Sequence, residues 1–96
     1  KKVSDRFGYE VLPPEAFVNS LGYEFMTPDK FEFSYAALQM NIENYPNSTN
    51  VYDSMGDYYL ATKDSVKALE LFTKAIEVGP STVSQEKIDM LTKSLK

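Results

Sequence analysis

Apolar side chains recur along this chain at spacings of three and four residues, the pattern of helices that bury one face. Two clear stripes of this kind run through residues 69–78 and 88–95. No segment alternates apolar and polar residues over enough positions to indicate a strand. The pattern therefore predicts an all-α chain.

Prolines, glycines and capping residues divide this pattern into five predicted helices. Every predicted connection is short, which requires neighbouring helices to run antiparallel. The predicted helices run from Pro14 to about Met26, from Pro28 to about Tyr45, from Thr49 to about Thr62, from Ser65 to Val78, and from about residue 83 toward Lys96.

The predicted helix ends rest on residues that satisfy free backbone groups. At the start of a helix, small polar side chains accept hydrogen bonds from the N–H groups of the first turn. At its end, glycine and proline commonly come directly after the last turn. The last helix is expected to begin with a capping box, in which the first and fourth residues cap each other. The predicted N-caps are Thr27, Ser48 and Asp64, the capping box is Thr82 with Gln85, and the C-terminal stop is Gly79 with Pro80.

Two stretches of the chain align on each other without a gap at an offset of 34 residues. Leu21-Gly22 falls on Met55-Gly56, and Pro46 falls on Pro80. A fixed period of about 34 residues is typical of a helix–turn–helix repeat, whose units bury their apolar faces against each other. The sequence therefore predicts two stacked helical hairpins.

Small residues at equivalent repeat positions predict where the helices of each hairpin cross. Gly22 and Gly56 are expected at the crossings, because a side chain there would push the helices apart. Ser34 and Ala68 are the small residues of the second helices, and we expect Gly56 to meet Ala68. Large flat side chains are expected to fill the remaining space. These are Tyr52, Tyr59 and Phe72.

The second copy, Tyr52-x-x-Met55-Gly56-x-x-Tyr59 followed by Ala68, Phe72, Ala75 and Pro80, closely resembles the tetratricopeptide repeat. The resemblance implies a right-handed superhelix of two helix–turn–helix hairpins plus a C-terminal capping helix. It places repeat 1 at about 15–48, repeat 2 at about 49–82 and the capping helix at about 83–96. Two departures weaken it: Asn41 stands where the second copy has Ala75, and Lys63 occupies a turn position where the family usually has glycine.

Composition narrows the chemistry of the chain. Its 96 residues include neither cysteine nor histidine, which removes disulfides, thiolate metal sites and the usual general base. The net charge of −4, without a lysine and arginine cluster, argues against nucleic-acid binding. No apolar run approaches the roughly 20 residues of a membrane-spanning helix. We expect no catalytic, metal or cofactor site and no membrane insertion.

A second resemblance is more specific. The run from Val3 to Glu15, together with residues 19–23, 41–48 and 50–57, is similar to the C-terminal region of bacterial esterases of the α/β-hydrolase superfamily that resemble ferric-siderophore esterases. The resemblance implies a parent serine hydrolase upstream, joined through residues 1–13 as a leader. Gly-x-Ser-x-Gly is absent, and without histidine this chain cannot assemble a Ser-His-Asp triad.

The tetratricopeptide resemblance also implies a concave face lined by the first helix of each hairpin. Asparagine and tyrosine side chains there can hydrogen-bond a peptide backbone, and two aspartates would favour basic side chains. The alternative is that Asp53 and Asp57 form a solvated acidic face of the scaffold. The candidate concave-face residues are Asn19, Tyr23, Asn50, Asp53 and Asp57.

From these observations we expect a non-catalytic interaction or packing module whose partner is a protein, a peptide or the parent hydrolase domain. The alternatives are a structural lid that shapes substrate access to the parent active site, and a homo-oligomerisation module. The sequence leaves the compartment open between bacterial cytoplasm and periplasm. The terminal helix is expected to dock on residues 69–78 through Ile88, Leu91 and Leu95.

Overall fold

A computed structural model describes the backbone of residues 13–95 and the side chains of residues 13–93. This part of the chain is all-α, as predicted, and contains no strand. The leader expected at residues 1–13 lies, except for Pro13, outside the described residues. The helices are α1 (Glu15–Glu24), α2 (Phe31–Asn44), α3 (Thr49–Ala61), α4 (Ser65–Val78) and α5 (Thr82–Leu95), with a 3₁₀ turn η2 (Pro28–Lys30) before α2.

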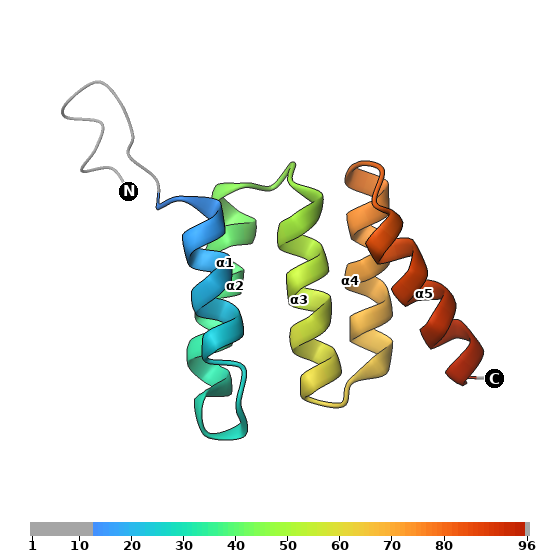
Figure 1. Ribbon diagram of the computed structural model, residues 1–96, viewed down its shortest axis with the longest axis horizontal. Helices are drawn as coiled ribbons and strands as arrows, with labels where there is room; N and C mark the ends of the chain where they lie inside the picture. The colour runs from blue at the N-terminus through green and yellow to red at the C-terminus, as the bar shows by residue number, and fades with distance from the viewer. Residues whose placement is uncertain (1–12, 96) are drawn as a thin grey trace.

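The helices form two antiparallel hairpins and a final helix placed side by side (Figure 1). Helix α1 packs on α2 and α3 packs on α4, while α2 and α1 both contact α3. Helix α5 packs on α4, so the predicted docking of the terminal helix is confirmed. Ile88 and Leu91 are half-buried at that contact, whereas the side chain of Leu95 lies outside the described ones.

Glycines stand at the closest approach within each hairpin. A Cβ atom added at Gly22 would lie 2.6 Å from Cγ of Leu38, and one added at Gly56 would lie 2.6 Å from Cδ1 of Phe72. Leu38 and Phe72 are fully buried. The predicted crossing positions are therefore correct, but the nearest neighbour of Gly56 is Phe72 rather than Ala68.

Ser34, the small residue of the first hairpin, forms a hydrogen bond that its counterpart Ala68 cannot form. The Ser34 hydroxyl donates to the Gly22 carbonyl at 2.7 Å. Asn41, a departure from the repeat pattern, is fully buried and its Nδ2 donates to the Glu15 carbonyl at 3.0 Å. These two hydrogen bonds join α1 to α2, where the equivalent positions of the second hairpin hold Ala68 and Ala75.

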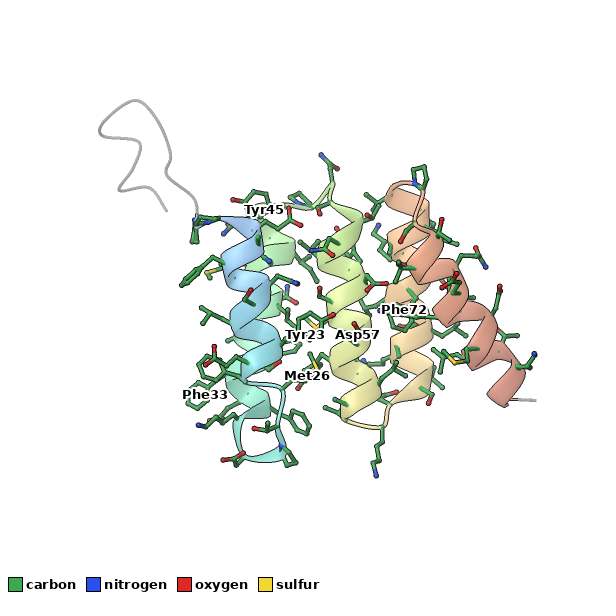
Figure 2. The ribbon with its side chains drawn as sticks, in the orientation of Figure 1. Tyr23, Met26, Phe33, Tyr45, Asp57 and Phe72 are labelled. Carbon is green, nitrogen blue, oxygen red and sulfur yellow. The ribbon has the colours of Figure 1, made fainter. Side chains whose placement is uncertain are left out.

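Tyrosine hydroxyls connect the ends of the helices to the loops. Tyr52, in the core cluster with Val51 and Ala75, donates to the Pro46 carbonyl at 2.7 Å. Tyr45 donates to the Pro13 carbonyl at 2.7 Å and so holds the chain entering α1 against the end of α2, where Figure 2 shows it. Each tyrosine keeps its ring among apolar groups while its hydroxyl finds a backbone acceptor.

One predicted N-cap is confirmed and two lie in the right place without capping. Asp64 accepts from the Lys67 N–H at 3.1 Å. Ser48 precedes α3, but its hydroxyl donates to Oε2 of Glu15 at 2.7 Å. The Thr27 hydroxyl donates to Asp29 at 2.9 Å, and only a 3₁₀ turn follows it.

The cap of the last helix is shifted by one residue from the predicted capping box. The Ser84 N–H donates to the Ser81 hydroxyl oxygen at 3.2 Å, so Ser81 rather than Thr82 caps α5. Gln85 reaches forward to Asp89 at 3.0 Å instead of back to the cap. The prediction failed because serine and threonine are adjacent here and both are competent caps.

Gly79 follows α4 as predicted, but its backbone is extended, with φ of −176°, and is not left-handed. Within residues 13–95, Lys63 has a left-handed backbone, with φ of 68°. This confirms that Lys63 occupies a turn position suited to glycine. For residues other than glycine, the left-handed backbone conformation costs roughly 1–2 kcal/mol of conformational free energy.

We predict that Lys63→Gly raises the stability of the chain. Relief of the left-handed strain is offset in part by the greater entropy of glycine in the unfolded chain, leaving a gain of about 0.5–1 kcal/mol. Chemical denaturation at neutral pH measures it. Lys63→Ala is the matched control, since it removes the same exposed charge but keeps the strain, and equal stability of the two variants would contradict the prediction.

Candidate functional site

The face shared by α1, α3 and α5

The structure places the five predicted concave-face residues on two adjacent helices. Asn19 and Tyr23 belong to α1, whereas Asn50, Asp53 and Asp57 belong to α3. Tyr23 points toward Asp57 across the space between α1 and α3 (Figure 2), and its hydroxyl donates to Oδ2 of Asp57. The first helices of the two hairpins therefore lie side by side, as the concave-face prediction requires.

The two asparagines are tied to different partners. The Asn19 side-chain oxygen accepts from the Ser54 hydroxyl of α3. Asn50 is exposed at the other end of α3, where its Nδ2 lies 3.4 Å from Oε2 of Glu15. Asn50 is thus separate from the cluster around the aspartates.

Both aspartates bind a lysine that sequence reasoning did not include. Lys87 of α5 places Nζ 2.8 Å from Oδ1 of Asp53 and 3.0 Å from each carboxylate oxygen of Asp57. The same ammonium lies 5.3 Å from the centre of the Phe72 ring. One cation from the last helix therefore bridges two carboxylates of α3 over an aromatic face of α4.

Hydroxyl groups donate the remaining hydrogen bonds to the carboxylates of Asp53 and Asp57. Ser84 of α5 is fully buried and donates to Oδ2 of Asp53 at 2.6 Å. With the Tyr23 hydroxyl on Asp57, all four carboxylate oxygens accept a hydrogen bond from the same chain. Neutral donors offset the negative charge that a single lysine leaves uncompensated.

This arrangement corrects the interpretation of Asp53 and Asp57 as a solvated acidic face. Asp53 is only 8% exposed, and Asp57 is half-buried. Sequence reasoning missed the burial because it depends on α5, whose Ser84 and Lys87 side chains reach Asp53. We expected a bound peptide to supply a basic side chain to the two aspartates, but in this structure the chain's own Lys87 binds them.

A signal for Lys87 was nevertheless present in the sequence. Tyr23 and Asp57 are 34 residues apart, and so are Asp53 and Lys87. The repeat offset therefore continues into α5, which packs on α4 as α3 packs on α2. Extending the alignment one further step would have placed Lys87 opposite Asp53.

Two groups of this cluster titrate at higher pH than usual. Burial alone would lower the pKa of Lys87, but its hydrogen bonds and charge interactions with Asp53 and Asp57 outweigh burial and raise that pKa. The pKa of Tyr23 is raised by burial first and by the hydrogen bond to Asp57 second. Both groups therefore hold their protons more tightly in the folded chain than in the unfolded chain.

We predict from these shifts a loss of stability at alkaline pH. A group whose pKa is raised on folding stabilises fully below its unfolded pKa, and this contribution disappears as pH rises through the folded value. The ordinary values are 10.0 for tyrosine and 10.5 for lysine, so the loss begins near pH 10. Urea midpoints between pH 8 and 11.5 measure it.

Tyr23→Phe and Lys87→Gln are the matched variants for this pH series, because each removes one titrating group of the cluster. Each variant should show a shallower alkaline decline than the parent chain. Parallel declines in all three proteins would assign the pH dependence to other residues.

The described part of the chain offers no enclosed site for a small ligand. It contains no pocket, and it has no group of three or more side chains placed to hold a metal ion. No helix within residues 13–95 combines the length and apolar character that crossing a membrane requires.

Comparisons of the chain with protein-family models, with curated proteins and with solved structures found no match.

Proposed function

We propose that this chain is a non-catalytic, tetratricopeptide-like packing and interaction module, carried at the C-terminal side of a bacterial esterase of the α/β-hydrolase superfamily. The strongest support for a repeat array of helical hairpins is that equivalent contacts recur 34 residues apart along the chain. Gly22 meets Leu38 as Gly56 meets Phe72. Tyr23 bonds Asp57 as Asp53 bonds Lys87.

The distribution of exposed apolar side chains favours packing through the first hairpin. The outward side of α1 and α2 carries Phe17 and Phe33, which are 60% and 54% exposed. Met40 lies seven residues after Phe33, on the same face of α2, and is also exposed. In Figure 2 Phe33 projects from the side of the first hairpin away from α3. Exposed apolar side chains that share a face are typical of contact surfaces.

The concave face is less available to a ligand than this outer face. Asp53 and Asp57 already bind Lys87, and Tyr23 and Asn19 bond within the array. A peptide would have to displace these contacts, whereas a domain packing on Phe17 and Phe33 would displace only water. We therefore place the contact with the parent hydrolase domain on the first hairpin.

The test is association of this chain with the separately produced upstream hydrolase domain, measured by calorimetry. Phe17→Asp combined with Phe33→Asp should weaken binding at least tenfold, since both charges would be desolvated at the contact. Val66→Asp is the matched control, because Val66 is 61% exposed but belongs to the second hairpin. Absence of binding, or equal loss in both variants, would refute the proposed packing.

We also predict that the isolated chain does not hydrolyse esters. It contains no histidine or cysteine and no nucleophile elbow. Release of p-nitrophenol from p-nitrophenyl acetate should match that of a heat-denatured sample. Turnover above this background that a point substitution in the chain abolishes would overturn the non-catalytic assignment.

A further inference from the structure

Helix α5 buries fewer side chains on the array than its neighbours do. Among residues 82–93, Ser84 is the only fully buried one, and Ile88 and Leu91 are half-buried. Helix α4 buries three residues and α3 buries six in succession. Since the stability of a helix in a protein comes mainly from its buried face, α5 is held less firmly by apolar packing than α3 and α4 are.

Polar contacts to α3 supply the rest of the attachment of α5. The Ser84 hydroxyl donates to Oδ2 of Asp53 at 2.6 Å, and Lys87 Nζ lies 2.8 Å from Oδ1 of the same carboxylate. The Lys87 ammonium also lies 3.0 Å from both carboxylate oxygens of Asp57. Detachment of α5 would therefore break one ion-pair cluster and one hydrogen bond at the same time.

The two hairpins are packed through contacts of their own. The close approaches at Gly22 and Gly56 and the core cluster around Val51 are formed by residues of α1 to α4. These contacts can persist when α5 leaves. A helix of 14 residues is marginal in water by itself, so α5 would lose the protection of its backbone amides on leaving.

The Asp57 carboxylate is shared between α5 and the first hairpin. Oδ2 of Asp57 accepts from the Tyr23 hydroxyl of α1 and from Lys87 of α5. Figure 1 shows α1 and α5 on different sides of α3, and Figure 2 shows Tyr23 pointing at Asp57 between α1 and α3. The Tyr23 hydroxyl orients the carboxylate that Lys87 binds, so the position of Tyr23 affects how well α5 is held.

We propose that α5 detaches and docks as a unit while both hairpins stay folded, and that Asp57 couples this motion to Tyr23 of the first hairpin. Tyr23 is 41% exposed. A molecule that packs on its ring and moves its hydroxyl away from Asp57 would therefore favour detachment of α5 without touching it. Detachment exposes Asp53, Asp57 and the Phe72 ring, which Lys87 faces in the docked state.

Native-state hydrogen exchange of the full chain tests independent detachment. The amides of residues 86–93 should exchange through an opening of lower free energy than those of α3 and α4. Lys87→Gln should speed the exchange of residues 86–93 about thirtyfold, whereas Lys67→Gln, at an exposed position of α4, should leave it unchanged. Equal opening free energies for α5, α3 and α4 would refute detachment as a unit.

Tyr23→Phe tests the coupling, with Tyr45→Phe as the matched control. Each variant removes one tyrosine hydroxyl from the first hairpin, but that of Tyr45 donates to the Pro13 carbonyl and not to Asp57. Both hydrogen bonds are lost whether α5 is docked or detached, so only coupling can alter the exchange of α5. Tyr23→Phe should speed exchange of residues 86–93 about threefold or more, and Tyr45→Phe should not change it. Equal or slower exchange in Tyr23→Phe would refute the coupling.

An Asp57→Ala background identifies the carrier of the coupling. In that background Tyr23→Phe should no longer change the exchange of residues 86–93, and an effect that persists would refute the role of Asp57. Where a variant lowers overall stability, the ratio of α5 to α4 exchange rates is the readout. These measurements use the chain without the hydrolase domain, so their outcome is independent of the proposed hydrolase contact.

Discussion

Replacing Gly56 by leucine should lower the free energy of unfolding by about 3 kcal/mol, the upper end of the usual cost of overpacking a core. The reason is the absence of space on α4: a Cβ alone at this position would lie 2.6 Å from Cδ1 and 2.8 Å from Cζ of Phe72. Phe72 is fully buried, so its ring cannot turn aside into solvent. The α3–α4 hairpin must open to admit the new side chain.

Thermal unfolding measures this effect, and a loss of that size corresponds to at least about 10 °C in a domain of this length. Gly79→Ala is the control, because a Cβ there would meet the Thr49 methyl group at 3.2 Å and the backbone is extended. It should change the melting temperature by only a few degrees. An unchanged melting temperature for Gly56→Leu would contradict the observed α3–α4 crossing.

Lys87→Gln should destabilise the chain by about 2 kcal/mol, between the values for exposed ion pairs and for fully buried ones. The cost comes from the carboxylate left behind. Asp53 is 8% exposed and would lose the ammonium that lies 2.8 Å from its Oδ1. Since Lys87 is the ion-pair partner of both aspartates, α5 would also lose its charged anchor on α3.

A double-mutant cycle with Asp53→Asn separates the ion pair from packing effects. The substituted asparagine side chain carries no charge, so Lys87→Gln should cost much less in the Asp53→Asn background than in the parent chain. Lys67→Gln is the matched surface control, because Lys67 is exposed, lies 6.0 Å from the Tyr59 ring and forms no ion pair with the described residues. Additive losses in the cycle would show that Lys87 and Asp53 do not depend on each other.

The capping and helix-breaking residues predicted the helix ends well, because these residues lie next to the backbone groups that they affect. The predicted ends of α3 and α4 differ from the observed ends by at most one residue, since Asp64 and the Gly79-Pro80 pair act on adjacent backbone groups. The same local chemistry failed where a side chain had a better distant partner. Ser48 is placed as a cap, but Glu15 of another helix takes its hydroxyl.

The periodicity of the sequence also predicted the hairpin crossings. Two helices can approach closely only where a residue has no side chain, and Gly22 and Gly56 meet that condition in both hairpins. Which side chain fills each crossing was not predictable from spacing alone. Phe72, and not Ala68, lies nearest Gly56, because the choice depends on how α4 is rotated about its axis against α3.

The acidic cluster shows the same division between sequence and tertiary structure. Residue types and spacing were enough to place Asp53 and Asp57 on one helical face, since side chains four residues apart project together. Their burial, their shared lysine and the Ser84 hydrogen bond depend on α5 packing on α4, from where the Ser84 and Lys87 side chains reach α3. A carboxylate's solvation depends on what packs over it, and the covering helix begins about 30 residues later in the chain. Only the assembled array brings those groups within hydrogen-bonding distance.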